Sequence, residues 1–504
     1  MSYLVDLILN EFRSVVQDLG KDGGLISPSV YDTAQVLRLY PPQGGAQAVV
    51  EWLLEQRSSD GGWGDASTPS ARDVPTLASI LALHVYGHHP TARAAVATGL
   101  AFLRRQAEQW MDSLADDIPV GVELLLPRLL EEATAVGLAL PLHLYSSLIS
   151  FGLRRRTLIA RAQPRAGTPA IHSWEAWGIH PDPQLVDPTG GVGNSPAATA
   201  AWLRAAGPSA PLPKPLLLAQ HYLIAAGAAT ETGIPGVVPT VWPIARFEQA
   251  FGLFSLFNAG LLRDKRVHDQ VSVQLDDLAG ALGGRGLGMS DSFLPDGDNT
   301  AVALAVLRAA GRPVDLAVLQ QFQMADHFSA YVGEQQPSLS LTAHALHALT
   351  LFDETPPQVE AYVLQRQLPD GRWPSDKWHS SWLYTTGHVM LALHPVRHQA
   401  ALHAAIDALL THQQLDGGWG SAETTTEETA YAVLALCHVQ RQQKLPHIGA
   451  ALSRAKEWLL HQYCLFASTG SKRWIGKETY RPLRIARAFE LSALLTLLME
   501  HGDE

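Results

Sequence analysis

Acidic and amide side chains crowd together at the point where a loop leads into an apolar stretch. Asp296, Asp298 and Asn299 lie within four residues, directly before residues 300–310, which are rich in Ala, Val and Leu. A carboxyl group that is crowded by other acids and shielded from water is hard to ionise, so its pKa rises. The segment therefore predicts a general acid that protonates a carbon–carbon double bond. The alternative is that Asp298 or Asn299 only caps a helix.

Helical periodicity dominates the chain and supplies the elements that must position this acid. Apolar residues recur at intervals of three and four with little strand-like alternation, and short loops with Gly, Pro and Asp separate the segments. These segments include 96–109, 301–310, 340–351, 383–393, 426–436, 450–462 and 483–499. The pattern predicts an all-α protein built of helical hairpins.

Three loops repeat one phrase, in which Gln and Trp flank Asp-Gly. The copies lie at 56–64, 367–373 and 413–420. Asp-Gly forms a tight turn after a helix, and we expect the Gln and Trp side chains to stack and tie neighbouring hairpins together. Repeated helical hairpins predict a ring or array of helices. A platform of Trp side chains for carbohydrate is the functional alternative.

The composition limits the class of protein. Of 504 residues, 47% are hydrophobic and 17% are charged, which favours more than one domain, or one large domain with an insertion, around an apolar core. A net charge of −11 argues against a nucleic-acid partner. Two cysteines exclude a disulfide framework and a cysteine-rich zinc site. Because acidic residues interrupt the apolar N-terminal segment and no apolar run reaches about 18 residues, we expect no signal peptide, no stable membrane insertion and a cytoplasmic location.

Together, the repeats and residues 296–301 resemble the terpenoid cyclases, whose QW repeats decorate α/α barrels and whose acid motif reads Asp-x-Asp-Asp-Thr-Ala. Within that superfamily, the chain length resembles that of the bacterial class II diterpene cyclases, such as copalyl and halimadienyl diphosphate synthases. Further matching phrases follow in order along nearly the whole chain, at 29–34, 119–123, 169–175, 194–200, 238–240, 376–381 and 474–481.

The resemblance implies an all-α fold of two α/α double-barrel domains, β and γ, with γ inserted after the first helix of β. Residues 1–23 and 266–504 are expected to form β, and residues 24–265 are expected to form γ. The active site is expected between the two domains, a normal place for a ligand pocket.

The implied activity is protonation and cyclisation of geranylgeranyl diphosphate to a bicyclic diphosphate, without loss of the diphosphate. A labdane product of the copalyl type is favoured over a rearranged halimane or clerodane (kolavenyl-type) product. A drimenyl-type cyclase acting on farnesyl diphosphate and a non-catalytic helical-repeat scaffold are further alternatives. No Asp-Asp-x-x-Asp motif is present in the sequence, so a separate class I terpene synthase is the implied downstream partner.

The resemblance assigns roles around the acid. Asp298 is the implied general acid, and Asp296 keeps it poised. Asn299 stands where relatives commonly carry Asp; an amide forms hydrogen bonds but cannot supply a negative charge. His344 occupies a place where related enzymes put a polar residue near the acid, and His379 is a second candidate for that role.

The resemblance also suggests how the reaction ends. In copalyl-forming relatives a histidine and an asparagine hold the water that accepts the final proton. His172 matches the histidine, and Thr240 stands at the position of the asparagine, where a hydroxyl can still anchor water. The histidine favours direct deprotonation over methyl and hydride migration.

A carbocation needs electron-rich walls, and each aromatic face offers about 0.5–2 kcal/mol of stabilisation. Two or three of the following six residues are expected to line the cavity: Trp174, Trp242, Trp378, Trp382, Tyr384 and Tyr431.

The retained diphosphate needs positive charge and, by resemblance, Mg²⁺. The candidates for the positive charge are Arg154, Arg155, Arg156 and Lys477. The candidate Mg²⁺ ligands are Glu123, Asp116 and Asp117.

Overall fold

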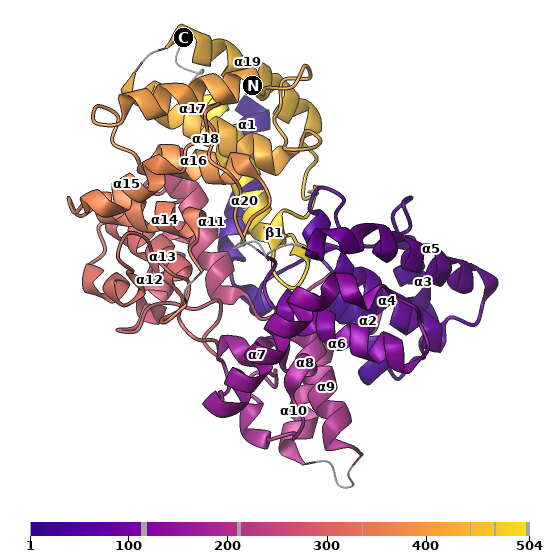
Figure 1. Cartoon of the computed structure of the whole chain (residues 1–504). Helices are drawn as coiled ribbons and strands as arrows, with labels where there is room; N and C mark the ends of the chain where they lie inside the picture. Colours follow the sequence, from indigo (N-terminus) through magenta and orange to yellow (C-terminus); the bar gives the residue numbers. More distant parts are fainter. Residues whose placement is uncertain are drawn as a thin grey trace.

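The computed structural model describes residues 2–111, 118–208, 213–334, 336–443, 445–467 and 470–499. Two helical bodies lie side by side (Figure 1): one contains α1 and the orange-to-yellow C-terminal helices, and the other contains the indigo-to-magenta helices α2–α10. All seven segments with helical periodicity fall on helices. The expected all-α class is correct.

The first body is a double ring of helices. Each inner helix contacts the next, and the last contacts the first. In order, the inner helices are α11 (Ala245–Ala259), α13 (Gly297–Ala309), α14 (Leu339–Thr350), α16 (Trp382–Ala392), α18 (Thr426–Gln442) and α20 (Leu483–Met499). The outer layer is α1 (Ser2–Gln17), α12 (His268–Ala281), the 3-10 helix η7 (Leu316–Phe322), α15 (Pro357–Gln365), α17 (Gln399–Thr411) and α19 (Pro446–Gln462). Because inner and outer helices alternate along the chain, the inner helices run parallel to one another.

The second body is a smaller ring of the same kind. Its inner helices contact one another in the order α2 (Val30–Leu39), α4 (Asp73–Tyr86), α6 (Val122–Ala135), α8 (Trp174–Trp177) and α9 (Pro196–Ala206), which contacts α2. Packed outside are α3 (Gln47–Glu55), α5 (Pro90–Gln106), α7 (Ser146–Ala162) and α10 (Lys214–Ala228). Short 3-10 helices in the connections are η1 (Lys21–Gly23), η2 (Pro69–Ala71), η3 (Ala107–Trp110), η4 (Leu142–Tyr145), η5 (Pro169–Ser173) and η6 (Pro183–Leu185).

The repeated loops tie outer helices to inner ones. The indole N–H of Trp373 donates to the carbonyl of Val363 at 2.8 Å, and that of Trp419 donates to Leu409 at 2.7 Å, in each case ten residues back on an outer helix. The side-chain amide of Gln413 donates to the backbone of the next outer helix, at Ala451. The repeat Trp side chains are fully buried, which excludes a carbohydrate platform.

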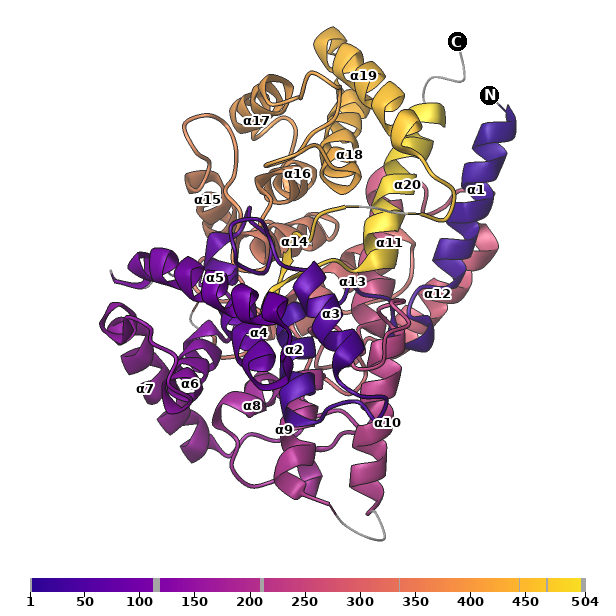
Figure 2. The same cartoon turned by 90° about the vertical axis from the view of Figure 1, so that its right-hand side faces the viewer.

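The hydrophobic core follows the two rings. One large cluster joins α1, α11 and the helices up to α20, and two smaller clusters fill the second ring. Both views place α1 beside α20, with the two chain ends at the same end of the molecule (Figure 2). The expected domain division stays a prediction, but α11 packs in the first ring although it precedes residue 266. Core packing therefore puts a boundary before Ala245.

A short hairpin lies between the two rings. Strand β1 (Trp474–Ile475) pairs antiparallel with β2 (Thr479–Tyr480), with Trp474 opposite Tyr480. Among the helices that the structure describes, none is long and apolar enough to cross a membrane.

Candidate active site

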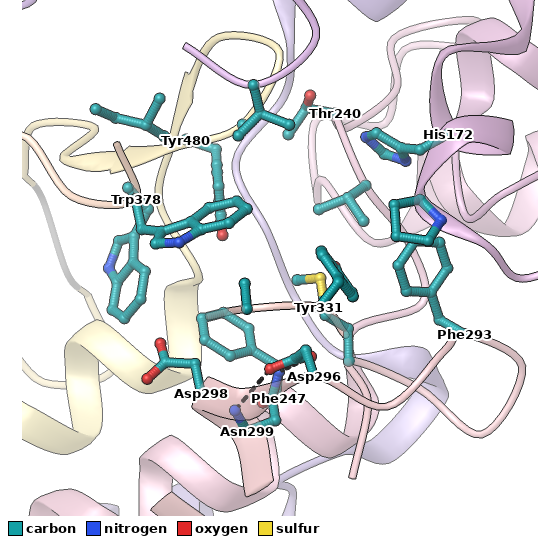
Figure 3. Close-up of a pocket in the computed structure, with 18 residues that line it drawn as sticks. His172, Thr240, Phe247, Phe293, Asp296, Asp298, Asn299, Tyr331, Trp378 and Tyr480 are labelled. Atoms are coloured by element: carbon teal, nitrogen blue, oxygen red, sulfur yellow. Dashed lines mark hydrogen bonds between the residues drawn. The ribbon is translucent and has the colours of Figure 1, made fainter. Parts of the chain in front are cut away.

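A cavity with about 860 Å³ of empty space, its open mouth included, lies where the two rings and the hairpin meet. Pro169, His172 and Thr240 line it from the side of the second ring, and Asp296, Asp298 and Asn299 line it from the N-terminus of α13 (Figure 3). The structure thus brings together the sequence-predicted acid group and the pair predicted to end the reaction.

Asp296 is the cap of α13. It has an extended backbone, and its carboxylate accepts the backbone N–H of Asn299 at 2.8 Å. The side-chain amide of Asn299 donates to the second carboxylate oxygen, also at 2.8 Å. The segment therefore does cap the helix, as one interpretation predicted. The capping residue is Asp296, however, and not Asp298 or Asn299.

Burial governs the charge of Asp296. The pKa of Asp296 is raised to about 7, chiefly because burial removes the carboxyl from water; the two hydrogen bonds from Asn299 oppose the rise, and the nearby Asp298 carboxyl adds to it. Both donors on Asn299 are N–H groups, which stabilise the ionised form of a carboxyl. Asp296 is thus held as an acceptor at the helix end.

Asp298 reaches the cavity and contacts a buried histidine. One carboxyl oxygen lies 2.6 Å from Nδ1 of His344, whose side chain is 1% exposed, against 18% for Asp298. Figure 3 shows the Asp298 carboxyl turned away from the bonded pair of Asp296 and Asn299. His379, the other candidate for this contact, lies elsewhere: it stacks on Tyr384 with centroids 4.0 Å apart.

His172 and Thr240 lie across the cavity from Asp298 (Figure 3). Nδ1 of His172 lies 2.8 Å from the carbonyl oxygen of Gly193, so it carries the proton and donates it, which leaves Nε2 as a lone-pair acceptor. Burial lowers the pKa of His172 to about 3, with a smaller effect of the charge on Lys477. The Thr240 hydroxyl is buried and has no hydrogen-bond partner among the described residues. The two groups form an uncharged pair that can accept a proton or hold water.

Comparisons with known proteins decide the family. The chain is 46% identical to (+)-kolavenyl diphosphate synthase of Herpetosiphon aurantiacus over 99% of both chains. It is 34% identical to ent-copalyl diphosphate synthase of Streptomyces sp. strain KO-3988, over 94% of this chain and 92% of that protein. The chain is a class II diterpene cyclase. The squalene-hopene cyclase C-terminal domain matches residues 309–442. The solved ent-copalyl diphosphate synthase from Streptomyces platensis superposes with a TM-score of 0.80 at 29% identity, covering 97% of this chain and 99% of that one.

The wall of the cyclase cavity is aromatic, but only one of the six expected residues contributes to it. Trp378 lines the cavity. The others lie outside the lining: Trp174, Trp242, Trp382, Tyr384 and Tyr431. The rings that do line it are Phe247, Phe293, Tyr331, Trp474 and Tyr480.

The five predicted aromatic residues that lie outside the cavity lining have packing roles. Trp174 and Trp242 are buried in the core of the second ring. Trp382, the first residue of the inner helix α16, lies against His412, which follows the outer helix α17; the ring centroids are 5.2 Å apart. Tyr384 and Tyr431 stand inside the first ring, 5.1 Å apart. Of the rings that line the wall, Trp474 and Tyr480 fall in the phrase 474–481, which matches the family; the other three carried no sequence signal.

The candidate cations are not in the cavity wall. Lys477 is fully buried between the rings, where its ammonium donates to Glu175 and Ser195, each at 2.6 Å. Arg156 pairs with Glu131 at 2.9 Å on the outside of the second ring. Arg154 and Arg155 lie over the ring of Phe151. The lining residues that the structure describes include no Arg or Lys.

The candidate magnesium ligands do not form a site within the described residues. Glu123 lies in the first turn of α6, where burial raises its pKa and the charge of Arg155 partly opposes the rise. Asp116 and Asp117 lie outside the described residues. Within the described ranges, no three His, Cys, Asp or Glu side chains gather as a metal site requires. Mg²⁺ therefore stays a prediction.

Proposed function

We propose that Asp298 is the general acid of this cyclase and that it protonates the terminal double bond of geranylgeranyl diphosphate. The observation that carries the proposal is the contact of Asp298 with His344 at the edge of an apolar cavity. When Nδ1–H of His344 occupies one oxygen, the acid proton stays on the other, which is free to face the substrate. Asp296, held by Asn299, fixes the backbone that carries the acid.

The cation that follows protonation forms among aromatic faces. Each of Trp378, Trp474, Tyr480 and Tyr331 offers about 0.5–2 kcal/mol of cation–π stabilisation where its face meets the cation. Their rings line the cavity with few competing nucleophiles. This wall supports ring closure before quenching, and the diphosphate is retained because initiation occurs at the other end of the chain.

Loss of a proton near His172 ends the reaction in this proposal. The Nε2 lone pair of His172, or a water molecule held by His172 and Thr240, accepts the proton. A low pKa makes His172 a weak base, but a carbocation is a strong enough acid to lose a proton to it or to water.

Our first candidate for the product is a rearranged, kolavenyl-type bicyclic diphosphate. Its support is the 46% identity to (+)-kolavenyl diphosphate synthase, against 34% to ent-copalyl diphosphate synthase. A labdane of the copalyl type is the second candidate, and the position of His172 across the cavity favours it, since a nearby base shortens the life of the cation. Either product keeps its diphosphate and is a substrate for a separate class I enzyme that ionises it. We also propose that Mg²⁺ accompanies the diphosphate.

Incubation with geranylgeranyl diphosphate tests the proposal. We expect a cyclic diphosphate that, after dephosphorylation, NMR identifies as a clerodane. Asp298→Ala should bind substrate and form no product, because only the proton donor is removed. Release of pyrophosphate would contradict a class II reaction, and turnover by Asp298→Ala would contradict the assigned acid. Conversion of farnesyl diphosphate alone would point to a drimenyl-type enzyme.

A further inference from the structure

A second group of polar side chains lies inside the first ring, behind His344 and away from the cavity. It contains buried nitrogen and oxygen atoms that have no hydrogen-bond partner within the described chain: Nε2 of His344, Nδ1 of His347, both ring nitrogens of His388 and the hydroxyl of Tyr384. All four residues belong to the inner helices α14 and α16. Buried polar atoms in proteins nearly always have partners, often ordered water, so such a concentration needs a physical explanation.

His388 is at the centre of this group. Its ring centroid lies 4.6 Å from that of His344 and 4.3 Å from that of Tyr384. Its other side stacks on Phe254 at 5.5 Å. Because His344 bonds Asp298 at 2.6 Å, two imidazoles stand in succession behind the acid.

The group continues toward the opposite end of the ring. His347 lies one turn beyond His344 on α14, and the ring of Phe254 contacts both. His438, on the last turns of α18, is partly exposed, and its proximity contributes to a lowered pKa of His347. The inner helices are parallel, so their last turns share the end that faces away from Asp298. His388 and His347 both lie against Phe254, and His438 is the partly exposed member of the group.

Burial keeps the inner imidazoles neutral. It lowers the pKa of His347 to about 3 and that of His388 well below its ordinary value. A neutral imidazole has one donor and one acceptor nitrogen, so it takes up a proton at one and releases a proton from the other. Neutral imidazoles joined by water transfer protons without holding a resident charge in the core.

We propose that His388 and His347, joined by buried water molecules, form a proton-return path that reloads Asp298 from the far end of the first ring. The inference rests on the proposed role of Asp298 as the acid. In each turnover Asp298 gives its proton to the substrate, whereas the cation loses a proton on the opposite wall, near His172. A path behind the acid replaces the proton without requiring water to enter the cavity.

The proton count closes over one turnover. His344 receives a proton at Nε2 and passes the proton on Nδ1 to the carboxylate of Asp298, so it leaves the step as a neutral imidazole of the other tautomer. Before the next turnover the Asp298 carboxyl rotates so that its proton faces the cavity, and His344 returns to the Nδ1–H tautomer by exchanging protons with the buried water. One proton enters at His438 and one leaves near His172. Nothing is oxidised or reduced.

Rapid-quench kinetics of His388→Phe test the path. Phenylalanine fills the space beside Phe254 but cannot carry a proton. We expect the first turnover to stay within about twofold of the wild-type rate and the steady-state rate to fall by about tenfold or more, the scale of lost proton-transfer catalysis. A burst of one product per active site should therefore appear. Deuterium oxide should slow the steady state of the variant more than the burst, because the burst contains only the transfer from Asp298 to the substrate and the steady state adds the transfers of the return path.

Two further variants make the result decisive. His412→Phe, at a histidine of the outer layer that bonds the carbonyl of Ala408, should change neither phase. His347→Phe, beside Phe257, should produce the same burst and serves if His388→Phe does not fold. Equal loss in both phases would show a structural role and overturn the path, as would an unchanged steady state. Asp298→Ala separates the two proposals, because turnover by that variant would refute the acid itself.

Discussion

Two carboxyl groups that lie two residues apart have different surroundings at the N-terminus of α13. Asp296 is 4% exposed and accepts both a backbone and a side-chain N–H from Asn299. Asp298 borders the cavity and bonds His344. Helix geometry accounts for the difference, because the cap position turns back over the first N–H groups whereas a side chain in the first turn points outward. One residue therefore holds the turn, and the other is free for chemistry.

Asn299→Asp tests the importance of an N–H donor at this position. A carboxyl group repeats the side-chain bond to Asp296 only while it is protonated, so the bond is lost as the pH rises. We expect the free energy of unfolding to fall below that of the wild type by about 1–3 kcal/mol at high pH, the cost of a lost buried hydrogen bond, and by less at low pH. Chemical denaturation at a series of pH values measures this. A deficit that does not change with pH would contradict the account.

His172→Phe tests the termination step. Removing the base lengthens the life of the cation, so 1,2-shifts compete more effectively, while phenylalanine keeps the cavity filled. We expect substrate consumption within about threefold of the wild type and an altered product mixture, with a different position of the double bond or a different extent of rearrangement. Gas chromatography of the dephosphorylated products gives the ratio. The parent product alone, formed at the parent rate, would mean that His172 is an ordinary buried histidine.

The same variant has a predicted effect on stability. His172 has a folded pKa of about 3, lowered by burial from about 6.5. The unfolded chain therefore binds a proton at a pH where the folded chain does not, and the wild type loses stability as the pH falls through 6.5 toward 3. Relative to His172→Phe, we expect a loss of about 2 kcal/mol between pH 7 and pH 5. If the free energies of unfolding of the two proteins changed with pH in the same way, His172 would not be a neutral, desolvated side chain.

At the scale of elements, the hairpin β1–β2 joins the two rings and carries part of the cavity wall. Arg473 bonds Glu428 at 3.1 Å, and Arg481 bonds Glu490 at 2.6 Å, on the side of the first ring. Lys477, between them in sequence, bonds Glu175 on the side of the second ring. Buried charges thus fix the position of a segment that is too short to be stable alone.

Lys477→Met should destabilise the protein more than it weakens substrate binding. The change leaves the carboxyls of Glu175 and Asp32 without their buried cation, which costs about 3–5 kcal/mol. The pKa of Asp32 is already raised to about 7, chiefly by burial and against the opposing charge of Lys477. Adding Glu175→Gln should restore part of the stability. Thermal unfolding and KM measure the two effects; a large rise in KM with unchanged stability would instead support a diphosphate contact.

At the scale of the molecule, sequence periodicity was sufficient to locate the helices and the repeats. The burial of Trp373 and Trp419 at equivalent places follows from that local pattern. The acid segment was also found locally, because its crowding needs only four residues. The burial of Lys477 was not predicted, because a charged residue that distant Glu175 and Ser195 enclose has no local signature. The same reason explains why Tyr331 and Phe247 were missed and why the packing of α11 in the first ring was not foreseen.

The two rings and the hairpin enclose a reaction that, in this account, starts at one wall and ends at the other. The most direct test is mass spectrometry of the intact diphosphate product after incubation with geranylgeranyl diphosphate in deuterium oxide, for the wild type and for Asp298→Asn. We predict a cyclic diphosphate that has gained one deuterium and lost one hydrogen, and no product from Asp298→Asn. A product without diphosphate, a product without deuterium, or the same product from the variant would contradict initiation by Asp298.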